Sequence, residues 1–187
     1  MSIRAQVVTG FPRDGDRPSF GELEAWAGKG RVRRAAASEV ANWRLSEADR
    51  AALTESGVPL FDELVHGESF RAMPGMYRLA YYEGTYVNWD YGVLPGSGEV
   101  RRWERDGTSQ FVNSSVVLWL CSLQMVGGWF TRSTAIHHWD ENGETEDQAR
   151  AEIDDLLGRI GVADPAAIGD GSHETHFWPA VLDRWMY

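Results

Sequence analysis

The sequence of 187 residues contains one cysteine, Cys121, and no long apolar run. A single cysteine excludes a disulfide within the chain and is typical of a reducing compartment. The first ten residues, MSIRAQVVTG, lack the apolar core of a signal peptide, and a bilayer span needs roughly 20 consecutive apolar residues. These absences predict a cytoplasmic protein that has no membrane partner.

Positive charge is scarce at the end of the chain. Residues 140–187 hold 12 acidic and 3 basic residues, a net charge of 3 − 12 = −9, whereas residues 1–139 hold 16 acidic and 15 basic residues. Because phosphate binding needs cationic side chains, this balance argues against nucleic acid as a ligand. It favours a basic protein partner, and the alternative is a solvated face that keeps the protein soluble.

Tryptophan, in contrast, is abundant. Nine tryptophans are more than one hydrophobic core of this size usually encloses, so we expect some of them at a contact surface. The length is that of one globular domain, residues 1–187, in which residues 1–44 form an extension or the first helix.

Helix signals come first along the chain, and strand signals follow. Residues 19–22 (SFGE) have the spacing of a capping box, residues 46–49 (SEAD) begin a second helix, and Gly57 ends it. From residue 69 to residue 112, aromatic and β-branched residues predominate. The predicted strands are 76–83, 85–91 and 98–104, separated by short glycine-containing turns that favour an antiparallel meander.

Three small polar residues, Asn113-Ser114-Ser115, stand between the strand ending at Val112 and an apolar helix that Gly127-Gly128 is expected to end. A glycosylation acceptor has no role on a chain that is not secreted. A catalytic serine would need a glycine-flanked elbow and a neighbouring base. We therefore interpret Asn113 or Ser114 as the helix N-cap.

The last quarter of the chain is again helical. Thr145 and Gln148 predict a capping box, followed by an apolar stripe that Gly161 ends. Asp164-Pro165 predicts a further helical turn, and residues 180–186 predict the last helix. The predicted fold class is therefore α+β, an antiparallel sheet flanked by N- and C-terminal helices in a single domain.

Several segments resemble the SUKH superfamily of bacterial immunity proteins, most closely its fourth subfamily. The motif FVNSS at residues 111–115, followed at once by an apolar helix, carries the resemblance, together with ESGVPLF at 55–61, GVLPGSGEV at 92–100 and the closing segment 160–185. The resemblance spans roughly residues 45 to 187, and residues 1–44 and 129–146 do not contribute to it. It implies an α+β fold and a protein that neutralises a toxin, often a nuclease or a nucleic-acid deaminase, by occluding its substrate cleft. It implies no catalytic residues and no cofactor.

Two surfaces are candidates for contacting such a basic toxin domain. One is the open sheet face around Tyr82, Tyr86, Asn88 and Asp90, and the alternative is that helices cover this face. The other is the loop from residue 129 to residue 146 with the acidic helix that follows it, and we favour this second surface. Its candidate residues are Trp129, Trp139, Asp140, Glu141, Glu144, Asp147, Glu152 and Asp155.

Other classes of function have weaker support. His137-His138 with Asp140, and the stretch 173–176 (HETH), contain residue types that bind zinc. However, HETH lacks the spacing that places two histidines on one helix face, so we expect no metal site. A general protein-binding scaffold without a toxin would share the predicted fold. Whether the protein forms a homo-oligomer stays open at this point.

Overall fold

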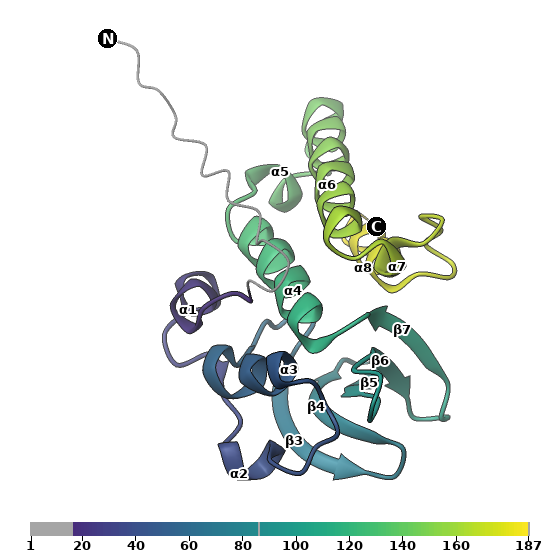
Figure 1. Cartoon of the computed structure of the whole chain (residues 1–187). Coiled ribbons are helices and arrows are strands. Elements are labelled where there is room, and N and C mark those ends of the chain that lie inside the picture. Colours follow the sequence, from purple (N-terminus) through teal and green to yellow (C-terminus); the bar gives the residue numbers. More distant parts are fainter. Residues whose placement is uncertain (1–16, 86, 187) are drawn as a thin grey trace.

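The computed structural model describes residues 17–85 and 87–186, and it confirms the α+β class (Figure 1). A five-stranded antiparallel sheet follows chain order, β3-β4-β5-β6-β7, which is the predicted meander. Its strands are β3 (Gly67–Met73), β4 (Met76–Glu83), β5 (Asn88–Val93), β6 (Val100–Glu104) and β7 (Ser109–Asn113). The prediction of β4 is confirmed to the residue, whereas β5 and β6 begin later than predicted.

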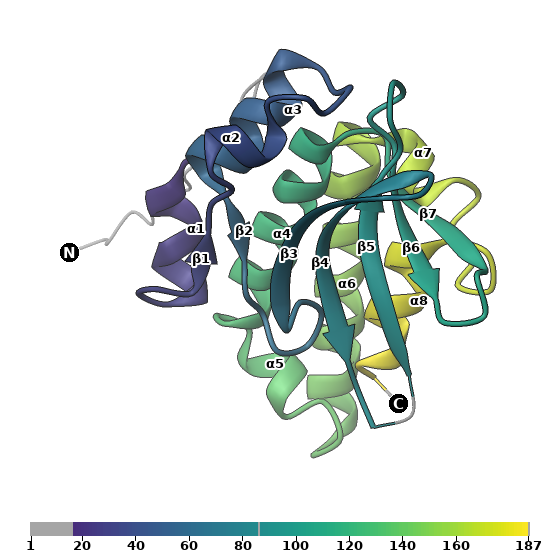
Figure 2. The same cartoon turned by 90° about the horizontal axis from the view of Figure 1, so that it is seen from below.

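Three helices cover one face of this sheet, and its other face has no described helix on it (Figure 2). They are α4 (Val116–Phe130), α6 (Gly143–Ala163) and α8 (Phe177–Arg184). Tyr91 of β5 is fully buried between the sheet and the helices, where its ring lies 5.3 Å from Trp119 of α4 and 5.9 Å from Phe177 of α8. The core therefore lies between the sheet and this helical layer.

The N-terminal elements pack beside the sheet and against α4. The predicted capping box is confirmed: Ser19 accepts from the backbone of Glu22, whose carboxylate accepts from the backbone of Ser19. Ser46 caps the second predicted helix, and Gly57 ends its last turn with a positive φ of 87°. The elements are α1 (Phe20–Ala27), β1 (Val32–Arg33), α2 (Ala37–Val40), α3 (Glu47–Ala51), one π-helical turn η1 (Ala52–Ser56) and β2 (Val58–Pro59).

The N-cap of α4 is Ser115, so the prediction of Asn113 or Ser114 is wrong. Ser115 Oγ accepts from the backbone N–H of Leu118. Asn113 is still paired in the sheet as the last residue of β7 and is completely buried. Strand pairing therefore continues one residue further than the sequence pattern indicates, and the helix starts correspondingly later.

The prediction that Gly127-Gly128 ends α4 is also wrong, because the helix continues to Phe130. A Cβ atom at position 127 would overlap the indole ring of Trp26 in α1. Glycine at this position thus permits the close approach of two helices.

In the C-terminal part, α6 begins one turn earlier than predicted and ends later. Asn142 is its N-cap and accepts from the backbone of Thr145, so the predicted capping box of Thr145 and Gln148 is wrong. Gly161 lies inside the helix. Two short helices complete the fold, α5 (Thr134–His137) and α7 (Pro165–Ile168), and α7 has the predicted proline at its first position.

Candidate protein-binding surfaces

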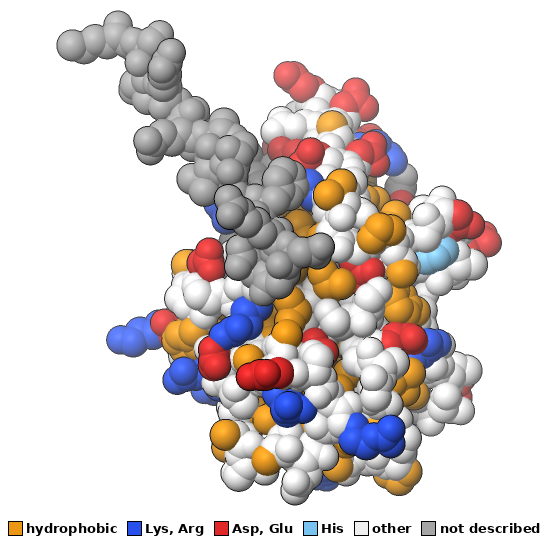
Figure 3. Space-filling model, viewed as in Figure 1, with side chains coloured by type: hydrophobic (Ala, Val, Ile, Leu, Met, Phe, Trp, Pro, Cys, Tyr) orange, Lys and Arg blue, Asp and Glu red, His pale blue; other side chains and the backbone are white. Residues whose placement is uncertain are grey.

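The outer face of α6 is acidic. Exposed carboxylates follow it along its length, namely Glu144, Asp147, Asp154 and Asp155. Asp155 lies 4.0 Å from Arg159, and no ion pair involves the other three among the residues that the structure describes. Figure 3 shows red side chains gathered over the α6 end of the molecule. Part of the negative charge of the last quarter is thus presented to solvent along one helix.

Two of the predicted contact residues, Trp129 and Glu152, are joined to each other. Trp129 Nε1 donates to Glu152 Oε2 at 3.0 Å, and the same oxygen accepts from Ser133 Oγ. Gln148 donates to the second oxygen at 2.9 Å. Burial by itself raises the pKa of Glu152, but these three hydrogen bonds together outweigh it and hold the pKa below its ordinary value. Glu152 therefore connects α4, α5 and α6.

The indole ring of Trp129 is partly packed. Its centroid lies 6.0 Å from that of Trp185, in a stacked arrangement. A shallow hollow of about 300 Å³ beside it is lined by Gln148, Asp155 and Leu156. The exposed part of Trp129 therefore lies at the border of the acidic face of α6.

The segment from residue 129 to residue 146 is not the predicted loop, because it contains the end of α4, all of α5 and the start of α6. Trp139 is half-buried and packs against the core. Asp140 is exposed, and Glu141 accepts from His138 Nδ1 at 2.7 Å. These residues lie at the N-terminal end of α6 and extend its acidic face.

On the sheet, Tyr82 does not belong to the open face, so this part of the prediction is wrong. Its ring stacks on buried Trp89 at 4.2 Å, on the side that the helices cover. A register shift at Leu79 in β4 moves the neighbouring Tyr81 to the open face, opposite Asp90. The alternation along β4 could not reveal this irregularity. Tyr86 lies outside the described residues.

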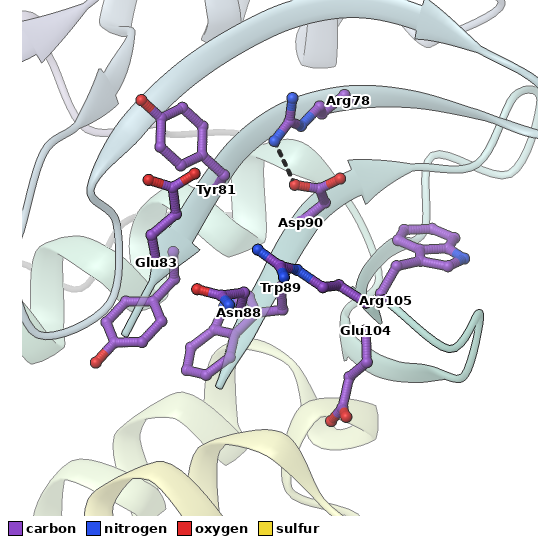
Figure 4. Close-up of a pocket in the computed structure, with 10 residues that line it drawn as sticks. Arg78, Tyr81, Glu83, Asn88, Trp89, Asp90, Glu104 and Arg105 are labelled. Carbon is purple, nitrogen blue, oxygen red and sulfur yellow. Dashed lines mark hydrogen bonds and ion pairs between the residues drawn. The ribbon is translucent and has the colours of Figure 1, made fainter. Parts of the chain in front are cut away.

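Asp90 lies in a hollow of about 180 Å³ on the open face (Figure 4). Asp90 accepts from Arg78 Nη2 at 2.5 Å, and the guanidinium of Arg78 lies 5.2 Å from the ring centre of Tyr81. Trp103 and Arg105 also line the hollow. Arginine and aromatic side chains of this kind are enriched among the residues that contribute most to binding in protein interfaces.

The sequence-based reasoning missed Trp103. It is half-buried on the open face and forms a shared wall between the first hollow and a second one of about 390 Å³ lined by Met76, Leu94 and Arg101. Gly92 lies beneath the indole, since a Cβ there would meet Trp103 at 3.0 Å. The alternation of Arg101 and Trp103 along the strand is the signal that could have indicated this position.

The histidines do not form a metal centre in the described part of the chain, where no three His, Cys, Asp or Glu side chains are grouped suitably for a metal ion. His137 Nε2 lies 2.9 Å from the carbonyl oxygen of Phe130, and His176 Nδ1 lies 3.2 Å from Asp170. Likewise, no helix within 17–85 and 87–186 is long and apolar enough to cross a bilayer.

Comparison with known proteins agrees with this architecture. The model of the SUKH-4 immunity protein family matches residues 18–184. No curated protein and no solved structure gives a significant match. The matched range includes residues 18–44 and 129–146, which do not contribute to the resemblance seen in the sequence motifs. Since the match covers nearly the whole chain, the chain belongs to the SUKH-4 immunity protein family.

Proposed function

We propose that this protein binds a cognate toxin in the cytoplasm and neutralises it by occluding the toxin's substrate cleft. The toxin is a basic protein domain, a nuclease or a nucleic-acid deaminase, because an enzyme that acts on nucleic acid carries cationic side chains for the phosphates. The membership of this chain in the SUKH-4 immunity protein family supports an immunity role. The protein acts by binding and performs no catalysis of its own.

The observation that carries the proposal is the row of exposed carboxylates on α6. Glu144, Asp147 and Asp154 are exposed and have no ion pair among the described residues, so their charge is available to a partner. Complementary charge accelerates encounter with a basic protein and fixes the orientation in which the two surfaces meet. A cleft that binds phosphates can accept such a row of carboxylates in place of its substrate.

The surface is also held rigid before binding. Glu152 joins α6 to Trp129 at the end of α4 and to Ser133, the N-cap of α5. Preorganisation of this kind reduces the conformational entropy lost on association. The acidic face is thus presented in a fixed geometry at the border of a partly exposed tryptophan.

An affinity purification from the native host tests the proposal. The immobilised protein is washed first at low and then at high salt, and each retained protein is identified by mass spectrometry and expressed in a sensitive host. We expect one stoichiometric basic protein, released by high salt, that stops growth unless this chain is co-expressed. Recovery of varied proteins without toxicity would contradict the proposal and favour a general binding scaffold.

A further inference from the structure

The open face of the sheet differs in charge from the rest of this acidic chain. Arg71 of β3 and Arg78 of β4 are directly opposite each other in the antiparallel pair, so both side chains point to the same face. Like charges in this position destabilise a sheet. Asp90 compensates Arg78, whereas exposed Arg71 has no charged partner within the described chain.

The same pattern recurs on β6 and in the turn after it. Arg101 is paired with Glu99, and exposed Arg105, at the first hollow, has no partner among residues 17–85 and 87–186. Glu83 at the rim of that hollow is also unpaired there. Asp106, next to Arg105 in the same turn, is likewise exposed and has no ion pair in the described chain, so this face is close to neutral, although the whole chain has a formal charge of −10.

Apolar groups lie beside these arginines. Trp103 separates the two hollows, and the larger hollow is lined by Met76 and Leu94. A surface of this composition fits a partner segment that combines carboxylates with a protruding apolar side chain.

The molecule itself carries such a segment in α6. Asp147 and Asp154 are seven residues apart and share one helix face, and Val162, two turns further on, has an exposed fraction of 76%. Gly158 between them has open space around its Cα, so a neighbour can approach closely. From Asp147 to Val162 the helix measures about 22 Å, and five strands span about 19 Å. The helix therefore has the length needed to cross the sheet.

A contact of this kind cannot form within one molecule. The helix α6 lies on the covered side of the sheet, so its outer face and the open sheet face point in opposite directions (Figure 2). We propose that the open sheet face binds the outer face of α6 of a second copy, in a head-to-tail arrangement. This heterologous contact forms chains of molecules or closes into a ring.

Such self-association covers the acidic face that binds the toxin in the proposed function. A basic toxin and a second copy then compete for α6. Binding of the toxin therefore dissociates the assembled form into single molecules. The self-association itself does not depend on whether a toxin exists, and it is measured with the purified protein alone.

Sedimentation velocity over a range of concentrations tests the proposal. At low salt, where charges are screened least, we expect the average mass to rise with concentration, and at high salt to return to that of the monomer. Two double variants, Arg71→Glu/Arg105→Glu on the sheet and Asp147→Lys/Asp154→Lys on α6, should each remain monomeric. Arg132→Glu, a charge reversal at an exposed position away from the sheet, should associate like the wild type.

Mixing the two double variants is the decisive step. Each retains one intact surface, and the two reversed surfaces are complementary to each other, so an equimolar mixture should regain the association that neither variant shows alone. A monomer at every concentration and salt, or self-association that survives in either double variant, would overturn the proposal. The sheet variant should still bind the toxin with wild-type affinity, which separates a failure of this inference from a failure of the proposed function.

Discussion

The carboxylate of Asp164 accepts two hydrogen bonds from Ser114, one from its backbone N–H at 2.8 Å and one from its Oγ at 2.7 Å. It accepts a third from Asn113 Nδ2 at 3.0 Å. Asn113 Oδ1 in turn accepts from Trp178 Nε1 at 3.1 Å. Asn113 at the end of β7 and Ser114 after it thus join the sheet to α7 and α8 through the buried side chains of Asn113 and Asp164, which explains why residues 113 and 114 are small and polar.

Replacing Asp164 with alanine should destabilise the fold strongly. The substitution leaves one N–H of the buried Asn113 amide without its acceptor and removes both hydrogen bonds of Ser114, and the expected loss is about 2 kcal/mol in the free energy of unfolding. Urea denaturation followed by circular dichroism measures it. Asp183→Ala, at an exposed carboxylate without a side-chain partner in the described structure, should change stability by less than about 0.5 kcal/mol. Equal effects of the two substitutions would contradict the role of the network.

Because Ser115 is the N-cap of α4, substitutions at this position should lower the stability of the protein by different amounts. Ser115→Ala removes the acceptor for the Leu118 N–H and should cost about 1 kcal/mol. Ser115→Asp retains an acceptor and should keep most of the stability, since aspartate is an equally good cap. A loss as large for aspartate as for alanine, measured by thermal unfolding, would show that the hydroxyl is needed for another reason.

Sequence patterns predicted the structure correctly where it depends on residues that are close together in the chain. The capping box at Ser19 and Glu22 and the whole of β4 were predicted correctly, because both depend on residues close in the chain. The N-cap position of Ser115 was not predicted, because it depends on β7 pairing one residue further than the pattern indicates. The orientation of Tyr81 was not predicted either, because it depends on a register shift in β4. The bond from Trp129 to Glu152 joins two helices and leaves no local signal.

Substitution of alanine for two helical glycines, Gly158 and Gly127, should have opposite effects on the stability of the protein. Gly158→Ala in α6 adds a Cβ that meets no neighbour within 4 Å, so better helix propensity should stabilise the protein by about 0.5–1 kcal/mol. Gly127→Ala in α4 would push against the ring of Trp26 and should destabilise by about 1–3 kcal/mol. Melting temperatures of the two variants report the signs, and a stabilised Gly127→Ala would contradict the close packing of α1 on α4.

Stability should depend on pH through Glu152. Its folded pKa lies below the ordinary value of 4.5, so its contribution is present above that pH and is lost as the pH falls through the folded pKa. The difference in unfolding free energy between the wild type and Glu152→Gln should therefore shrink on acidification. Ser133→Ala removes one of the donors and should raise the pKa of Glu152 in an NMR titration. An unchanged pKa in this variant would contradict the geometry.

The most direct test of the account is the affinity of the purified toxin for the wild type, for Asp147→Lys/Asp154→Lys and for the control Glu63→Lys, each by calorimetry at two salt concentrations. If α6 binds a basic cleft, the double variant should bind at least about tenfold weaker than the wild type, with a reduced dependence on salt, while the control binds normally. Equal affinity of the double variant and the wild type would show that the toxin binds elsewhere and would contradict the proposed function of the acidic face.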